Sequence, residues 1–136
     1  MRTIALLALA SFAMSATAEG WLCVSDNVVG FDPGERQSWT SKTFRASDKY
    51  VIRRSQNDGV VWEVIEVGES FPKFRCLEEF DRFQMLQCGI GLYAGFVFDR
   101  EALNFSMFDI VSYFPDDDDK DKPGSLFLMI GRCTAI

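Results

Sequence analysis

The sequence predicts an all-β protein, a small antiparallel barrel or sandwich of about eight strands held by two disulfides. Three observations support this prediction. Apolar and polar side chains alternate along short segments, turn residues separate these segments, and the chain contains four cysteines. An alternation with a period of two places one face of a strand in the core and the other in solvent.

Three segments in the second half of the chain show the alternation most clearly. Their expected buried faces are Val60, Trp62 and Val64; Leu92, Ala94, Phe96 and Phe98; and Leu103, Phe105 and Met107. Aromatic and β-branched side chains, which strands prefer, dominate these segments. Residues 126–130 are instead apolar on both faces, so we expect this segment to lie centrally in a sheet or to be covered on both sides.

Turn signals divide the chain into short apolar runs. They fall at residues 32–34, 57–59, 99–101 and 122–124. Strands are therefore expected near residues 21–24, 28–31, 43–45, 49–55, 60–67, 83–88, 92–98, 103–107, 109–114 and 125–133, and some of these are short enough to merge or to fail. Residues 76–87 can also be interpreted at helical spacing. We favour a hairpin there, with one helical turn as the alternative.

The first 18 residues have the three-part layout of a secretory signal peptide. A short positive region at Arg2 precedes an apolar run, and Ala-Thr-Ala at residues 16–18 forms a small-x-small cleavage site. The apolar run is too short to span a bilayer, which takes about 20 apolar residues. We therefore expect residues 1–18 to be a signal peptide and residues 19–136 to form a single β-rich domain, periplasmic or secreted, without membrane insertion.

The four cysteines all lie in the expected mature chain. An even number of cysteines in a small exported domain is typical of disulfides. Of the three possible pairings we favour Cys76–Cys88, which closes a short loop as across a hairpin, and Cys23–Cys133, which joins the first predicted strand to the last. Each is expected to add about 3–5 kcal/mol in the chain-entropy model. The irregular spacing and the lack of a C-x-x-C motif disfavour zinc.

Charge and composition restrict the function. Arg2 leaves with the signal, so the mature chain has 13 basic and 20 acidic residues and a net charge of −7. This balance argues against nucleic acid and permits a basic protein or an envelope component as partner. The chain contains no histidine, so neither a Ser-His-Asp nor a Cys-His nucleophile can be assembled. We expect no cofactor and assign no catalytic residue.

An acidic run at residues 116–121 is the strongest candidate metal site. Asp117, Asp119 and Asp121 have the spacing that opens a calcium-binding loop. The rest of that motif is missing, because Lys122 stands where its glycine belongs. A solvated hairpin tip is therefore favoured over a calcium site.

Three functions remain open. The leading hypothesis is a non-enzymatic extracytoplasmic module that binds or inhibits a partner, for instance a basic enzyme such as a lysozyme. The second is a small-molecule carrier that uses the barrel interior. The third is a carboxylate-based hydrolase built on Glu78, Glu79 and Asp81, although such a cluster is expected on any exposed loop.

Several short motifs resemble a group of short exported proteins of Gram-negative bacteria. The matching residues are Trp21-x-Cys23, Gly30-Phe31, the central pair Cys76 and Cys88, Phe96-Val97-Phe98-Asp99 with Leu103-Asn104-Phe105, and the closing Ile130-Gly131-Arg132-Cys133-Thr134. The group has no assigned activity. The resemblance therefore implies export and disulfides and brings no catalytic residues, and the acidic run at 116–121 departs from the pattern of the group.

Overall fold

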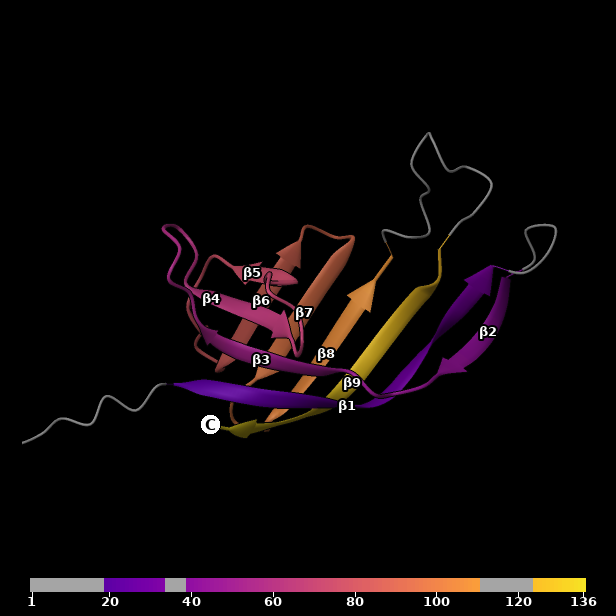
Figure 1. The fold of residues 1–136 in the computed structure, drawn as a ribbon, viewed down its shortest axis with the longest axis horizontal. Helices are drawn as coiled ribbons and strands as arrows, with labels where there is room; N and C mark the ends of the chain where they lie inside the picture. Colours follow the sequence, from indigo (N-terminus) through magenta and orange to yellow (C-terminus); the bar gives the residue numbers. More distant parts are fainter. Residues whose placement is uncertain (1–18, 34–38, 111–123) are drawn as a thin grey trace, which may run out of the picture.

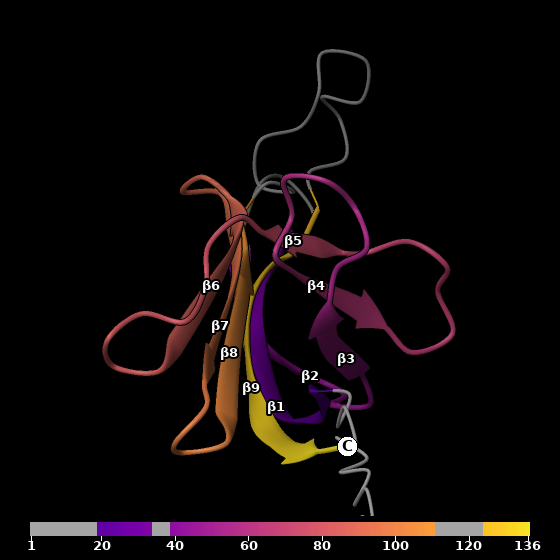
Figure 2. The same ribbon diagram turned by 90° about the vertical axis from the view of Figure 1, so that its left-hand side faces the viewer.

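The computed structural model describes residues 19–33, 39–110 and 124–136, which form a single antiparallel sheet curled into a nearly closed barrel (Figures 1 and 2). The all-β prediction is confirmed. The strands in the described part of the chain are β1 (Gly20–Pro33), β2 (Trp39–Phe44), β3 (Lys49–Arg54), β4 (Trp62–Glu66), β5 (Phe74–Cys76), β6 (Met85–Ile90), β7 (Ala94–Asp99), β8 (Asn104–Asp109) and β9 (Leu126–Ala135).

The first and last strands of the chain pair in the middle of the sheet. The hydrogen-bonded order is β5-β4-β3-β1-β9-β8-β7-β6, and β1 runs antiparallel to β9 from the pair Trp21–Ala135 to the pair Phe31–Leu126. The two ends of this order, β5 and β6, also lie next to each other. They are not sheet neighbours, so the seam between them is the place where the barrel lacks a hydrogen-bonded ladder.

Strand β1 is long because it pairs with two different strands along one of its edges. Its first half pairs with β3 and its second half with β2. Between these halves the register shifts from Ser25 to Asn27. The backbone N–H of Ser25 donates to the Asp48 carbonyl at 3.0 Å, and the Asp48 N–H donates to the Ser25 hydroxyl at 3.0 Å. The chain between β2 and β3 is thereby fixed to the bend, and the β1–β2 pair extends beyond the barrel (Figure 1).

Aromatic rings from opposite walls meet inside the barrel. The ring of Tyr50 on β3 lies 6.1 Å from Phe96 on β7 and 5.9 Å from Phe105 on β8. Trp21 on β1 lies 5.1 Å from Phe98 on β7. These strands are separated along the sheet, so the contacts cross the interior. The centre of the described barrel is therefore occupied by its own side chains.

Both predicted disulfides are present. Cys23 and Cys133 are directly opposite residues of β1 and β9, and Cys76 and Cys88 join β5 to β6 across the seam. The described chain holds no free cysteine. The first disulfide therefore reinforces an existing ladder, whereas the second replaces a missing one.

The hairpin expected over residues 76–87 is wrong, and so is its helical alternative. The disulfide-linked strands are at opposite ends of the sheet order, and the residues between them form a loop that covers one end of the barrel. Phe80 holds this loop on the barrel, because its ring packs against Trp21 and Trp62 at centroid distances of 5.6 and 5.4 Å, and these two rings lie 5.5 Å from each other. The partly buried ring thus packs against the core in place of the cross-strand pairing expected here.

Other strand predictions differ in detail. The segments 21–24 and 28–31 merge into β1, and the three-residue β5 was not expected. Leu92 and Leu103, predicted on buried faces, are 85% and 38% exposed. Both lie in turns that precede a strand, where the two-residue alternation no longer determines which way a side chain points.

Candidate functional site

The outer face of β9 and of the adjacent half of β1 is apolar and open. Met129 points into the core and is 2% exposed, whereas its neighbours Leu128 and Ile130 point outward and are 46% and 49% exposed. Val29 and Phe31 of β1 are 44% and 46% exposed. The strand lies centrally, as expected, but the described residues do not provide the cover that its second apolar face predicts.

These side chains are neighbours because of the strand register. Val29 is opposite Leu128, which is in turn opposite Phe108 of β8. Phe31 is opposite Leu126 in the next outward-facing row. Directly opposed side chains on one sheet face lie about 4.5–5.5 Å apart. The register therefore produces a continuous apolar surface across three strands.

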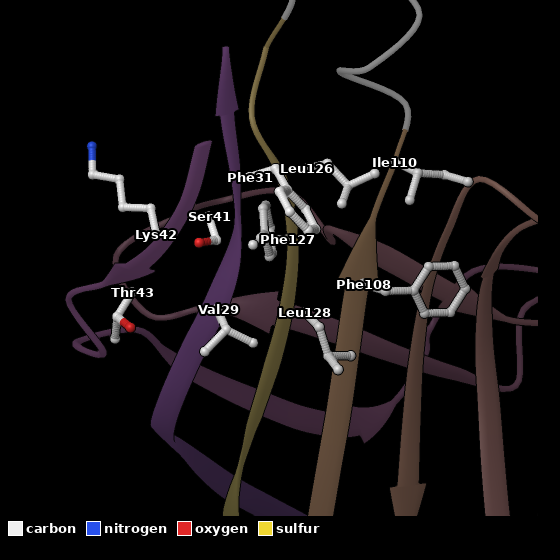
Figure 3. A pocket seen from close by; sticks show the side chains of 11 residues that line it. Val29, Phe31, Ser41, Lys42, Thr43, Phe108, Ile110, Leu126, Phe127 and Leu128 are labelled. Carbon is white, nitrogen blue, oxygen red and sulfur yellow. The ribbon is translucent and has the colours of Figure 1, made fainter. Parts of the chain in front are cut away.

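This surface forms a groove of about 530 Å³, which we call the outer groove (Figure 3). Side chains of β1, β8 and β9 form its walls, and three residues of β2 form one rim. The lining residues are Val29, Gly30, Phe31, Ser41, Lys42, Thr43, Phe108, Ile110, Leu126, Phe127 and Leu128. Its size and apolar lining are those of ordinary binding sites.

Two glycines let the strands beneath the groove pack closely. A Cβ on Gly95 of β7 would lie 2.7 Å from the ring of Phe108, so only glycine leaves room for that ring over β7. A Cβ on Gly30 would lie 2.0 Å from the Leu126 carbonyl, where β1 and β9 approach each other. The groove is thus built on closely packed strands.

The charged groups at the rim are already paired. Lys42 forms an ion pair of 2.9 Å with Asp32, and the Ser125 hydroxyl donates to the same carboxylate at 2.6 Å. The hydrogen bonds from Ser125 and then from Lys42 hold the pKa of Asp32 below its ordinary value. Figure 3 shows the Lys42 side chain directed away from the apolar walls. The outer groove is therefore suited to apolar contact rather than to recognition of a charge.

A second, more polar hollow of about 390 Å³ lies on the same sheet face and includes Ile130 in its lining. Arg132 binds Asp26 through two hydrogen bonds of 2.8 and 3.2 Å, which lower the pKa of that carboxyl. Asp99 accepts the backbone N–H groups of the turn that follows it. These carboxylates have structural partners, so this hollow also lacks a free acid–base pair.

The carboxylates considered for hydrolysis have other roles. Glu79 forms an ion pair with Arg54 and accepts a hydrogen bond of 3.0 Å from Trp62 Nε1. The hydrogen bond from Arg54, and to a lesser extent that from Trp62, lowers the pKa of Glu79. A glycosidase general acid requires the opposite shift. Asp81 accepts backbone N–H groups of its own loop, and Glu78 is exposed.

The calcium candidates Asp117, Asp119 and Asp121 lie outside the described residues. Within residues 19–33, 39–110 and 124–136, no three His, Cys, Asp or Glu side chains gather where they could hold a metal ion. No helix in that same part of the chain is long and apolar enough to cross a membrane.

Sequence reasoning did not identify the outer groove, although its signal was present. Residues 126–130 are apolar on both faces, which predicts cover on both sides. The same pattern arises when the second face is open and binds a partner. Periodicity alone does not distinguish a face covered by the chain itself from one that binds a partner.

Comparison with known proteins adds no relative, since no family model, no curated protein and no solved structure matches this chain. The resemblance to short exported proteins stays a prediction.

Proposed function

We propose that this chain is a non-enzymatic extracytoplasmic module that binds a partner protein through its outer groove. The observation that carries the proposal is the open apolar face of β1, β8 and β9, with Val29, Phe31, Leu128 and Ile130 each more than two-fifths exposed. Large contiguous apolar patches on the surface of soluble proteins often mark interaction sites. Binding here would supply cover that the described residues do not provide.

Three features support this proposal over the alternatives. The sequence has no histidine, and the carboxylates named above already have structural partners or stand alone. Rings from opposite walls meet across the barrel, so nothing favours a carrier that uses the interior. The two disulfides are compatible with an oxidising compartment, and together with the signal-like residues 1–18 they support export.

The charge of the chain indicates the kind of partner. With a net charge of −6 for the full sequence, the protein attracts basic partners at long range and repels acidic ones. A basic enzyme or a basic envelope component fits this charge, and inhibition of such an enzyme is the concrete form that we propose.

A pair of matched variants tests the proposal. Val29→Ser with Leu128→Ser removes two apolar side chains from the outer groove, and Phe71→Ser with Leu92→Ser removes two that are 82% and 85% exposed on loops. Each is tested for binding and inhibition against a panel of basic extracytoplasmic enzymes. We expect the groove variant to bind at least about tenfold more weakly, which corresponds to about 1.4 kcal/mol of binding free energy. The affinity of the loop variant should be unchanged. No binding by the wild-type protein, or equal loss in both variants, contradicts the proposal.

A further inference from the structure

We infer a second interaction surface, the loop of residues 77–84, which presents Leu77 and Phe83 to an apolar cleft in a basic protein. The inference rests on the proposed protein-binding role but not on the outer groove. This loop lies at the barrel end that carries Glu19, because Arg100 ion-pairs with Glu19 at 2.7 Å and lies 5.3 Å from the Phe80 ring. The outer groove extends toward the opposite end.

The base and the middle of the loop are fixed. Cys76, directly before the loop, is joined by a disulfide to Cys88 in the strand β6 that follows it. In the middle, the ring of Phe80 contacts Trp62 at 5.4 Å and Phe98 at 6.1 Å. Glu79 next to it accepts the hydrogen bond from Trp62 Nε1. The loop therefore cannot move as a free segment.

The tip of the loop is fixed by Asp81. Its Oδ1 accepts the backbone N–H groups of Phe83 and Met85 at 2.8 and 2.9 Å. Its own N–H donates to the Met85 carbonyl, and its carbonyl accepts from the Gln84 N–H, both at 3.0 Å. Gln84 has a φ of 60°, and its carbonyl accepts the Arg100 N–H at 3.0 Å. These contacts determine the direction of the two residues at the tip, 82 and 83.

On this fixed loop, large side chains face solvent. Leu77 is 67% exposed and Phe83 is 63% exposed, and the Arg82 guanidinium lies 4.6 Å from the Phe83 ring. A single exposed apolar residue is normal on a protein surface. Two of them on one pre-ordered loop are different, because binding then carries little cost in conformational entropy. Aromatic and arginine side chains are also those that most often dominate binding energy.

The loop carries three carboxylates, those of Glu78, Glu79 and Asp81, against the one guanidinium of Arg82, and this balance favours a basic partner. Glu78, adjacent to Leu77, is exposed, and no described residue pairs with it. The acidic balance of the whole chain acts in the same direction. A cleft that accepts Phe83 and carries a lysine or arginine within reach of Glu78 would match both features.

Photo-cross-linking tests the inference directly. A benzophenone amino acid is placed at position 83, or at position 71 as a control, and the protein is irradiated in its own export compartment. The control is matched, because Phe71 is 82% exposed and lies on the loop between β4 and β5 at the other end of those strands. We expect a protein adduct from position 83 only, and a basic protein in that adduct. No adduct at 83, an equal adduct at 71, or an acidic partner overturns the inference.

The affinity of the identified partner then separates the two surfaces. We expect Phe83→Ala to weaken binding at least tenfold and Phe71→Ala to leave it unchanged. Asp81→Ala, which frees the tip but keeps Phe83, should also weaken binding, whereas Asp81→Asn keeps the acceptor oxygen and should restore it. Unchanged affinity in Phe83→Ala overturns the inference. If the groove variant Val29→Ser with Leu128→Ser alone loses binding, the loop inference fails and the proposed function stands.

Discussion

Tyr50 has the least favourable environment among the core residues. It is fully buried on β3, and its hydroxyl has no hydrogen-bond partner among the described residues. Burial, and to a lesser extent the carboxylates of Asp48 and Glu66, raise the pKa of Tyr50 far above its ordinary value. The ring of Tyr50 packs on Phe96 and Phe105. Only the hydroxyl is therefore unfavourably placed.

Tyr50→Phe keeps the ring and removes the hydroxyl. We expect the free energy of unfolding to rise by about 1 kcal/mol, because an unsatisfied buried donor costs about 1–3 kcal/mol. The raised pKa means that the protonated hydroxyl is favoured in the folded state. With respect to this group, the free energy of unfolding is therefore constant below the ordinary tyrosine pKa of about 10 and falls as the pH rises above it.

Denaturant unfolding at neutral pH and at pH 11 measures both effects. The variant should be at least as stable as the wild type at neutral pH and should lose less stability in alkali. A loss of 1 kcal/mol or more at neutral pH would show that the hydroxyl has a partner and that this account of Tyr50 is wrong.

The two disulfides differ as elements of the fold. Cys23 and Cys133 lie within a ladder that is hydrogen-bonded along most of β1 and β9, whereas Cys76 and Cys88 connect strands that are not sheet neighbours. In the chain-entropy model, sequence separations of 110 and 12 residues correspond to about 5 and about 3 kcal/mol. We therefore expect the two disulfides to differ in how much they stabilise the fold and in which region they hold together.

Paired serine variants separate these roles. Cys23→Ser with Cys133→Ser should lower the global free energy of unfolding more, without opening one region. Cys76→Ser with Cys88→Ser should lower it less but should increase amide hydrogen exchange in β5 and in residues 77–84, because the seam has no ladder to hold it. Exchange that increases equally throughout the sheet in both variants would contradict this assignment.

Elements with strong alternation could be predicted from the sequence, and those defined by tertiary contact could not. Ala94, Phe96, Phe98, Phe105 and Met107 face the core as expected. The Cys23–Cys133 pair follows from the position of the first and last strands, whereas the prediction of Cys76–Cys88 rests on a hairpin that does not form. The three-residue β5 has too little sequence to show a period. The outer groove needs the register of three strands, which a single segment does not contain.

For the whole molecule, ion pairs join distant parts of the chain. Asp26 pairs with Arg132 between β1 and β9, and Glu79 pairs with Arg54 between the 77–84 loop and β3. In each case a hydrogen bond to the basic partner is the largest cause of a lowered carboxyl pKa. These carboxyls are exposed, so solvent screens the pairs and each contributes modestly.

Acid is therefore expected to weaken the fold gradually. A lowered folded-state pKa adds stability that is present above the ordinary carboxyl pKa of about 4 and is lost as the pH falls below it. Thermal melts between pH 6 and pH 2 should show this decline, and Asp26→Asn with Glu79→Gln should flatten it. A variant curve as steep as that of the wild type would show that other carboxyls are responsible.

The pairing of β1 with β9 also determines the order in which the barrel can be completed. A chain that emerges from its N-terminal end presents β1 long before β9 exists, so one edge of β1 stays without its partner until almost the whole domain has emerged. Folding is then limited by a contact between residues more than a hundred positions apart, which is typical of slow-folding topologies. During that interval Cys23 lacks its partner Cys133, whereas Cys76 and Cys88 have already emerged. Pairing of Cys23 with Cys76 or Cys88 is therefore the error to which this topology exposes the chain until Cys133 emerges.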